Sequence, residues 1–340
     1  MLGRYIIRRS VAALITLVGV SVLIFFLARV MPGDAAGIAL GESATLEQIA
    51  AYRERHGFNE PLHIQYWVYV TDVIDGDLGE SLYSGSKVLD DLAFTFPATL
   101  ELVLFSTVLM ISIGIPLGVL AGRFRDGYID NFTRVFSLLG VVTPSFVWAV
   151  FFLLAFAFYL KVLPVMGRLS EGIEPPPFVT GLYLIDTLVA GDWATFRDAL
   201  SHIIMPGIAL AMASIGQTTR MTRANVGESF EKTYIEFARA YGFNEFRTAV
   251  VYALRPALIP ILTILGLDIA IKFGSAFLVE TVFGWPGMAR YGVQVILFKD
   301  LNAIVGTVTV IGFFFIVINL IVDIVVAFVD PRIRLGSLAQ

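Results

Sequence analysis

Six apolar stretches, each close to the length that a helix needs to cross a membrane, constrain this chain more than any other feature. They cover residues 11–31, 98–121, 135–160, 203–218, 259–282 and 304–329. A helix needs about 20 largely apolar residues to span the hydrocarbon core, where no water is present to bind the backbone polar groups. The fourth stretch is the shortest. The sequence therefore predicts an all-α integral membrane protein with about six transmembrane helices.

The composition excludes several other kinds of protein. Hydrophobic residues make up 57% of the 340 residues and charged residues only 15%, which is outside the range of ordinary soluble domains. The net charge of -4 comes without any basic run, so nucleic acid is not an expected partner. There is no cysteine, and His56, His63 and His202 have no partner at the spacing of a metal site. No metal or cofactor is predicted.

The distribution of lysine and arginine predicts the orientation. The N-terminus, residues 122–134, residues 219–256 and the tail after 329 hold 14 of the 24 basic residues, and the opposite side holds eight in much longer loops. Short cytoplasmic loops carry the basic excess, so both termini are expected in the cytoplasm. We divide the chain into a cytoplasmic N-terminus with a retained first helix (1–31), an extracytoplasmic loop region (32–97) and a core domain (98–340) with five transmembrane helices and the cytoplasmic loop 219–256.

The long first extracytoplasmic loop is expected to be structured. Thr45 and Gln48 have the spacing of a capping box, and Gly57 is suited to end the helix that they begin. Pro61 suits the first turn of a second helix that runs towards Ile74. A loop of this kind either docks an external protein or has only a packing role, and the sequence leaves both open.

The cytoplasmic loop 219–256 contains a short predicted helix. Thr233 and Glu236 have capping-box spacing, and Gly242 is suited to end the helix after about two turns. So short a helix is marginal alone in water, so it needs a surface to pack against. Its expected apolar and aromatic face consists of Tyr234, Phe237, Ala238 and Tyr241. This face packs either on the protein's own membrane domain or on a cytoplasmic partner.

Charged residues within the apolar stretches are candidates for function because they are costly in lipid. Asp268 and Lys272 are four residues apart, so they lie on one face of the fifth helix. They either form a structural ion pair or line a substrate path. Glu101 and Glu280 are expected to reach the outer interface of the membrane.

Motifs along nearly the whole chain carry a resemblance to one family. They are 8–9 (RR), 31–34 (MPGD), 76–81 (GDLGES), 97–101 (PATLE), 115–118 (IPLG), 143–146 (TPSF), 163–167 (LPVMG), 237–242 (FARAYG), 282–287 (VFGWPG) and 330–332 (DPR). With these segments the chain resembles the permease subunits of peptide-type ATP-binding-cassette importers, which serve dipeptides, oligopeptides, nickel or glutathione.

The resemblance implies a site and a set of partners. The segment 238–242 is similar to the signature loop whose short helix sits in a groove on the ATPase subunit. The implied coupling residues are Thr233, Tyr234, Glu236, Phe237, Ala238, Arg239, Ala240, Tyr241 and Gly242. The resemblance also implies a second homologous permease, two cytoplasmic ATPases that bind ATP and Mg, an extracytoplasmic solute-binding protein, and a place in a prokaryotic inner membrane.

Common enzyme motifs do not occur in the sequence. It contains no Gly-x-x-x-x-Gly-Lys-Ser/Thr, no Gly-x-Ser-x-Gly and no His-Glu-x-x-His segment. A non-catalytic subunit is therefore expected. Two alternatives fit the composition: an ion-coupled secondary transporter, which predicts inverted repeats that we do not find, and a membrane scaffold without a translocation path. Neither accounts for the segment 237–242.

Overall fold

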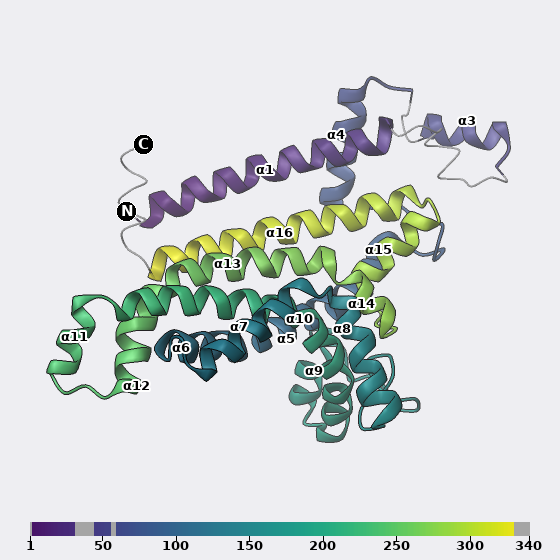
Figure 1. Ribbon diagram of the computed structural model, residues 1–340. Helices are drawn as coiled ribbons and strands as arrows, with labels where there is room; N and C mark the ends of the chain where they lie inside the picture. Colours follow the sequence, from purple (N-terminus) through teal and green to yellow (C-terminus); the bar gives the residue numbers. More distant parts are fainter. Residues whose placement is uncertain (1, 31–43, 56–58, 330–340) are drawn as a thin grey trace.

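The computed structural model describes residues 2–30, 44–55 and 59–329 (Figure 1). Over these residues the regular structure is helical, apart from an isolated bridge between Glu80 and Lys87. The helices, in chain order, are α1 (Leu2–Val30), α3 (Leu46–Arg55), α4 (Leu62–Asp75), α5 (Val88–Leu109), η1 (Met110–Gly114), α6 (Ile115–Arg123), α7 (Tyr128–Val142), α8 (Ser145–Phe152), η2 (Leu153–Tyr159), α9 (Tyr183–Ala190), α10 (Trp193–Phe230), α11 (Thr233–Ala240), α12 (Glu245–Arg247), η3 (Thr248–Ala253), α13 (Leu254–Ser275), α14 (Phe277–Val282), α15 (Met288–Leu297) and α16 (Leu301–Val329). The η segments are π-helical turns. Gly57 and the segments 31–34 and 330–332 lie outside the described residues.

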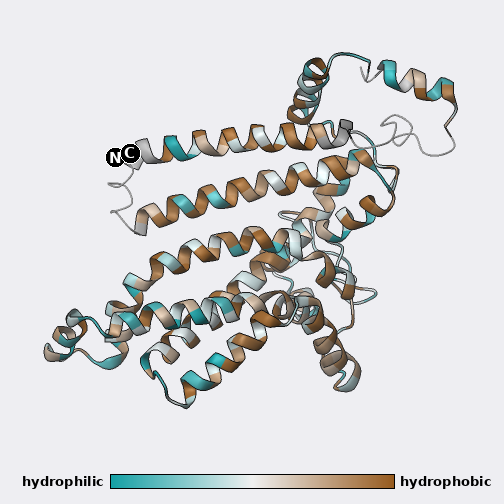
Figure 2. Cartoon of the chain, turned by 45° about the horizontal axis from the view of Figure 1, so that its top comes forward, coloured by the Kyte–Doolittle hydropathy of each residue, from teal (hydrophilic) through white to brown (hydrophobic). Residues whose placement is uncertain are grey.

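The prediction of about six membrane-spanning helices is confirmed. Within the described part of the chain, five helical segments are long and apolar enough to cross a membrane, and a bent pair of helices makes a sixth. The chain is therefore a multi-pass membrane protein. Hydrophobic residues predominate along α16 and along the coloured part of α1 (Figure 2).

The third predicted span, 135–160, is not one straight helix. Its two parts, Tyr128–Val142 and Ser145–Tyr159, meet at an angle of 104°. Thr143 has extended backbone angles (φ -84°, ψ 122°), and Pro144 then begins α8. A residue before proline is pushed out of the helical region, and proline itself has no N–H to continue the helix. A hydropathy profile alone does not detect this break.

The fourth predicted span, 203–218, is part of the longest helix, α10. The helix begins at Trp193, where the Asp192 carboxylate accepts hydrogen bonds from the amides of Ala194 (3.1 Å) and Thr195 (3.0 Å). It is also the most enclosed span: 72% of its apolar window is buried, against 11% for α1 and for α16. Helices α5–α9 and α13 pack around it. The helix extends beyond the predicted span at both ends, where charged residues such as Arg197, Arg220 and Glu228 are exposed.

The second predicted span, 98–121, also begins earlier than expected. Helix α5 starts at Val88, and Pro97 lies inside it rather than at its start. Asp90 and Asp91 lie in the first turn, where negatively charged side chains interact favourably with the positive end of the helix dipole. The fifth predicted span, 259–282, is divided between α13 and the short α14.

Glycines bring α6 and α10 into close contact. A Cβ atom placed on Gly118 would lie 2.4 Å from Thr222 Cβ and 2.8 Å from the carbonyl oxygen of Thr219. Gly114 and Gly122, one turn away on either side, also face α10 at distances that are tight for a Cβ. Small residues four apart let helix backbones approach in membranes, where van der Waals packing drives association. The α6–α10 contact therefore depends on the absence of side chains.

The first and last helices, α1 and α16, lie side by side. The N-terminal end of α1 and the C-terminal end of α16 lie at the same end of the bundle. Arg9 Nη1 is 3.1 Å from Asp323 Oδ2. The beginning of α1 and the end of α16 lie at the end of the bundle that also carries α11 and α12 (Figure 1). This agrees with termini on one side of the membrane. That this side is cytoplasmic stays a prediction from the charge distribution.

The predicted structure in the first loop is present. Helix α3 begins with the expected capping box: the Thr45 amide donates to Gln48 Oε1 (2.8 Å), and the Gln48 amide donates to Thr45 Oγ1 (3.3 Å). Pro61 stands directly before α4, which ends at Asp75 with Gly76 in the left-handed conformation. Both helices lie at the end opposite α11 (Figure 1).

We expect Gly118→Ala to destabilise the protein. Alanine normally favours a helix over glycine by about 1 kcal/mol, but here its Cβ meets α10, and overpacking of this kind costs about 1–3 kcal/mol. Thermal unfolding in detergent, followed by tryptophan fluorescence, measures the shift. Gly19→Ala in α1 is the matched control, because a Cβ there meets nothing within 4 Å. A midpoint for Gly118→Ala equal to or above that of Gly19→Ala would contradict the packing argument.

Candidate functional site

The end of α11 is set by a complete glycine-dependent cap. Gly242 has φ +79°, its amide donates to the Arg239 carbonyl (2.9 Å), and the Phe243 amide donates to the Ala238 carbonyl (3.2 Å). These two bonds form a Schellman motif, which satisfies the last carbonyls of the helix. The predicted stop at Gly242 is confirmed.

The predicted capping box at the start of α11 is wrong. The residue with extended angles before the helix is Lys232 (φ -89°, ψ 144°), and no side chain caps the helix. Thr233 is thus already the first helical residue, one position too late for its hydroxyl to act as a cap. The turn after α10 fixes this register, because the Lys232 amide donates to the Ser229 carbonyl (3.1 Å).

Helix α11 has one buried face and one aromatic face. Ile235 is completely buried and Ala238 is 4% exposed. Tyr234, Phe237 and Tyr241 point away from the protein, with exposed fractions of 40%, 62% and 81%. The prediction that Ala238 shares one face with Tyr234, Phe237 and Tyr241 is wrong, because Ala238 lies three residues from Ile235 and shares its buried side. Thr233, Glu236 and Ala240 are also exposed.

Two kinds of contact fix α11 to the bundle. Ile235 belongs to an apolar cluster with Val226 of α10 and Ala249 of η3. The Glu245 carboxylate pairs with Arg239 of α11 (3.1 Å) and also with Arg123 at the end of α6 (2.7 Å). We call the three exposed aromatic side chains of α11 the coupling surface. These contacts hold this surface in a fixed position on the bundle.

Asp268 and Lys272 lie in contact, with a third polar partner. Lys272 Nζ is 2.8 Å from Asp268 Oδ2, and Ser214 Oγ of α10 donates to Asp268 Oδ1 (2.5 Å). The Lys272 side chain is 3% exposed and lies 3.9 Å from Met110 Sδ, whereas that of Asp268 is 23% exposed. The pair thus joins α13, α10 and η1, and Asp268 is its accessible member.

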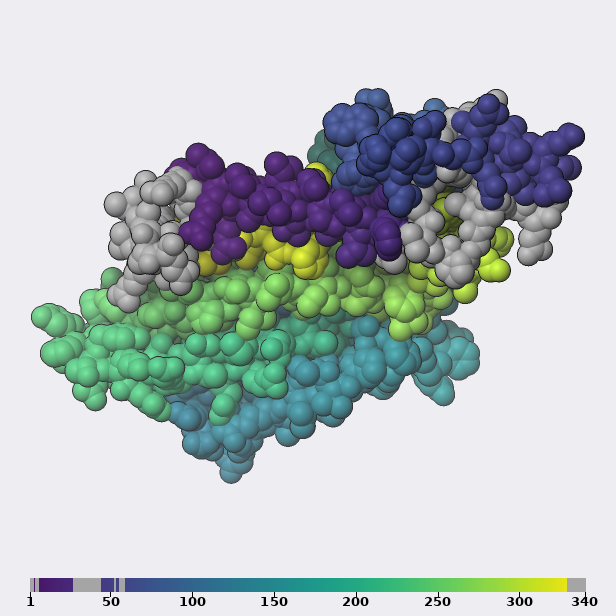
Figure 3. Space-filling model, turned by 90° about the horizontal axis from the view of Figure 1, so that it is seen from above, coloured from purple at the N-terminus to yellow at the C-terminus, as the bar shows by residue number. Residues whose placement is uncertain are grey.

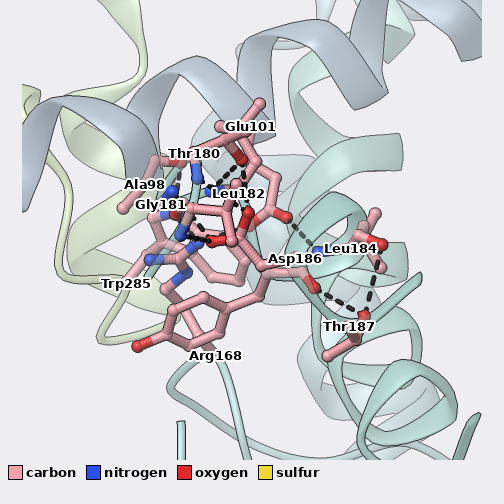
Figure 4. A network of polar contacts seen from close by, with 12 residues as sticks. Ala98, Glu101, Arg168, Thr180, Gly181, Leu182, Leu184, Asp186, Thr187 and Trp285 are labelled. Atoms are coloured by element: carbon pink, nitrogen blue, oxygen red, sulfur yellow. Dashed lines mark hydrogen bonds and ion pairs between the residues drawn. The ribbon is translucent and has the colours of Figure 1, made fainter. Parts of the chain in front are cut away.

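The structure corrects the expectation that Glu101 reaches the membrane interface. Glu101 is 5% exposed, and its Oε2 accepts a hydrogen bond from Arg168 Nη2 (2.7 Å) (Figure 4). Its Oε1 accepts from the Leu184 amide (2.7 Å), and Arg168 also donates to the Gly181 carbonyl (2.9 Å). The Arg168 guanidinium lies 3.5 Å from the ring centroid of Tyr183. A buried ion pair thus fastens the loop that contains Arg168 to α5 and α9.

Asp186 completes this network from the start of α9. It accepts hydrogen bonds from Thr180 Oγ1 (2.6 Å), from the Thr180 amide (2.8 Å) and from the Gly181 amide (2.9 Å) (Figure 4). Burial alone would raise the pKa of Asp186, but these donors outweigh it and hold the pKa below its usual value. The segment 160–182 between η2 and α9, which is predicted to be the second outer loop, is therefore held in place by charge-assisted bonds.

Glu280 is also buried rather than interfacial. Its carboxylate accepts from Thr99 Oγ1 (2.6 Å) and from the Arg290 amide (2.7 Å) near the start of α15. A Cβ on Gly287 would overlap this carboxylate, at 2.2 Å from Oε1. Sequence reasoning missed these contacts because Thr99 and Glu280 are far apart in the chain. The signals available were the motifs 97–101 and 282–287, which come together here.

No metal site is evident in the part of the chain that the structure describes, since no group of three or more His, Asp or Glu side chains converges there. That this chain binds no cofactor stays a prediction.

Comparison with known proteins identifies the family. Residues 114–335 match the binding-protein-dependent transport system inner membrane component family, and residues 1–103 match the N-terminal region of such membrane components. The chain belongs to this family of transport-system membrane components, as the motifs predicted.

Three curated relatives show what the chain is similar to. The probable D,D-dipeptide transport system permease protein of Escherichia coli strain K12 is 38% identical and covers 97% of both chains. The dipeptide transport system permease protein of Alkalihalophilus pseudofirmus is 34% identical over 97% of this chain and 99% of its own. The glutathione transport system permease protein of Salmonella paratyphi A is 30% identical over 97% and 98%.

We expect Lys272→Met to destabilise the protein more than the double variant Asp268→Asn/Lys272→Met does. Removal of one member of a buried ion pair leaves an uncompensated charge and costs about 3–5 kcal/mol, whereas replacement of both removes the charge as well. Thermal unfolding in detergent gives the ranking, and solute uptake by the double variant is measured in parallel. Normal uptake assigns the pair a structural role, and lost uptake in a stable double variant assigns it to the path. Equal destabilisation by the single and double variants would contradict the ion-pair argument.

Proposed function

We propose that this chain is the non-catalytic permease subunit of an ATP-binding-cassette importer, and that the coupling surface of α11 contacts a cytoplasmic ATPase. The observation that carries the proposal is the position of Tyr234, Phe237 and Tyr241: three exposed aromatic side chains on a capped helix that is fixed to the bundle. Aromatic side chains are typical anchors of protein interfaces. The same end of the bundle carries the basic segments 122–134 and 219–256.

ATP and Mg would then bind to the partner subunits. The sequence has no P-loop, and the relatives are named as permease proteins of transport systems. The complete assembly would contain a second homologous permease, two ATPases and an extracytoplasmic solute-binding protein in a prokaryotic inner membrane. A heterodimer of permeases is our working assumption.

The proposed solutes are short peptides. The similarity to a D,D-dipeptide permease protein at 38% identity and to a dipeptide permease protein at 34% supports this class. Glutathione, the solute in the name of the relative at 30% identity, is itself a short peptide. In the proposed assembly, the solute-binding protein determines the specificity among these solutes as much as this chain does.

In the proposed mechanism, movement of the ATPases displaces α11, and the bundle transmits that displacement as a switch between two access states. Ile235 links α11 to α10 through apolar packing, and Glu245 links it to α6 through ion pairs. Helix α10 contacts the surrounding helices along most of its length, so a displacement of its end reaches the membrane-embedded core.

Affinity purification of the tagged chain from native membranes tests the assembly. We expect a second permease and one or two P-loop ATPases to co-purify in mild detergent, with mass spectrometry as the readout. Purification of the chain alone, together with transport by the reconstituted chain without nucleotide, would contradict the proposal and favour a secondary transporter.

We expect Phe237→Ala to weaken binding of the ATPase by about tenfold or more, because truncation of an aromatic hot-spot side chain costs about 2 kcal/mol or more and about 1.4 kcal/mol corresponds to tenfold. Retention of the ATPase on the immobilised permease measures this effect. Tyr128→Ala is the control, because Tyr128 is 94% exposed at the start of α7 and is not part of α11. Equal losses for the two variants would exclude a specific role of the coupling surface.

We expect Gly242→Val to uncouple ATP hydrolysis from transport while the chain still inserts into the membrane. A Cβ at Gly242 meets nothing within 4 Å, so the effect comes from the left-handed backbone and not from a clash. Gly242→Asn is the matched variant, because asparagine tolerates this conformation, and it should retain most of the coupling. The measurement is the ratio of solute transported to ATP hydrolysed in proteoliposomes. An unchanged ratio for Gly242→Val would refute the role of this cap.

A further inference from the structure

Helix α4 is apolar on two opposite faces. Its inner face packs on α1, where Tyr66 and Tyr69 lie 5.4 Å and 5.8 Å from the ring centroid of Phe25. Its outer face points away from the protein. This face consists of Ile64, Trp67, Val68 and Ile74, with exposed fractions of 40%, 68%, 43% and 77%. A helix that is apolar on both sides needs an apolar cover on both.

Two hydrogen bonds fix the depth of α4 relative to the spans. Tyr66 Oη is 2.8 Å from Ser21 Oγ of α1, and Tyr69 Oη is 3.1 Å from Thr309 Oγ1 of α16. Ser21 lies within the apolar stretch 11–31 of α1, and Thr309 lies within the apolar stretch 304–329 of α16. Helix α4 therefore lies beside the spans and not beyond their ends.

The direction of α4 agrees with this position. The helix crosses α1 at a steep angle (Figure 1), and the space-filling view shows it against the side of α1 near the end opposite α11 (Figure 3). Because α1 and α16 run across the membrane, a helix that crosses them steeply runs along the membrane plane. Its outer face is then presented sideways, away from α1 and α16.

We propose that α4 is an in-plane membrane anchor whose outer face, with Trp67 at its centre, contacts the boundary between lipid headgroups and acyl chains. Tryptophan and tyrosine are enriched at this boundary because one part of the ring is apolar and the other is polar. Helices that lie in the interface bury their apolar face by about 5–10 Å into the boundary between headgroups and acyl chains.

The charges of α4 distinguish it from most surface-bound helices. It contains Asp72 and Asp75 and neither lysine nor arginine. Its contact with the membrane therefore depends on apolar area and not on attraction to anionic lipids, so salt and anionic lipid should have little effect. The anchor ties α1 to α16 at this end of the bundle and fixes the depth of both.

Spin labels on single cysteines test the proposal, and the cysteine-free sequence allows each label to be placed alone. The test positions are Trp67→Cys and Ile74→Cys. Leu14→Cys, 61% exposed within the span of α1, is the lipid reference, and Glu174→Cys in the exposed second outer loop is the water reference. The full chain, and the assembly that co-purifies with it, are measured in phosphatidylcholine nanodiscs with and without phosphatidylglycerol. Collision with oxygen, which enters lipid, is compared with collision with a water-soluble nickel chelate.

We expect the labels at 67 and 74 to collide with the nickel chelate several-fold less than the label at 174. Their oxygen accessibility should approach that at position 14, and both values should be the same in the two lipid mixtures. Nickel accessibility equal to that at position 174 would show a solvated helix and overturn the proposal. Protection from both reagents, in the chain alone or in the assembly, would show a protein partner on this face and overturn it equally.

Discussion

The close contact between α10 and α6 is the interaction on which the rest of the structure depends. Apolar side chains gain nothing by leaving lipid for another apolar surface, so helices in a membrane associate through packing and interhelical hydrogen bonds. Gly118 allows the two backbones to approach until Thr222 fills the space of a missing side chain. With α10 enclosed in this way, most residues of its apolar window are buried, whereas the peripheral helices α1 and α16 are left with most of their surface uncovered.

Three buried carboxylates, Glu101, Asp186 and Glu280, organise the end of the bundle opposite α11. Glu101 and Glu280 are held by donors from segments far apart in the chain, Asp186 is held by the neighbouring segment 179–181, and none of the three lies free at the surface. Their joint effect is to fix the segment before α9 and the α14–α15 segment to the bundle. The end of the bundle that carries α11 is held by the apolar cluster of Ile235, by partly exposed ion pairs of Glu245, and by the buried Asp130, which pairs with Arg134 and Arg223.

The sequence could predict those features that depend on local composition. Hydropathy located the spans, and turn chemistry located the stop at Gly242 and the cap at Thr45. Prediction from the sequence failed where contacts between distant segments determine the structure. Helix α10 is longer than the predicted span because it continues past both ends of the apolar stretch 203–218 into segments with exposed charged residues such as Arg197 and Glu228. Glu101 was placed at the interface because its partner Arg168 lies in a loop 67 positions away. The capping box at Thr233 failed by a single residue, because the preceding turn sets the register of α11.

The attachment of α11 to the bundle combines two interactions that respond differently to salt. The apolar contact of Ile235 is not weakened by charge screening, whereas the pairs that Glu245 forms with Arg123 and Arg239 are partly exposed and are screened by dissolved ions. Added salt is therefore expected to weaken the attachment of α11 to α6 through Glu245 more than its apolar attachment through Ile235.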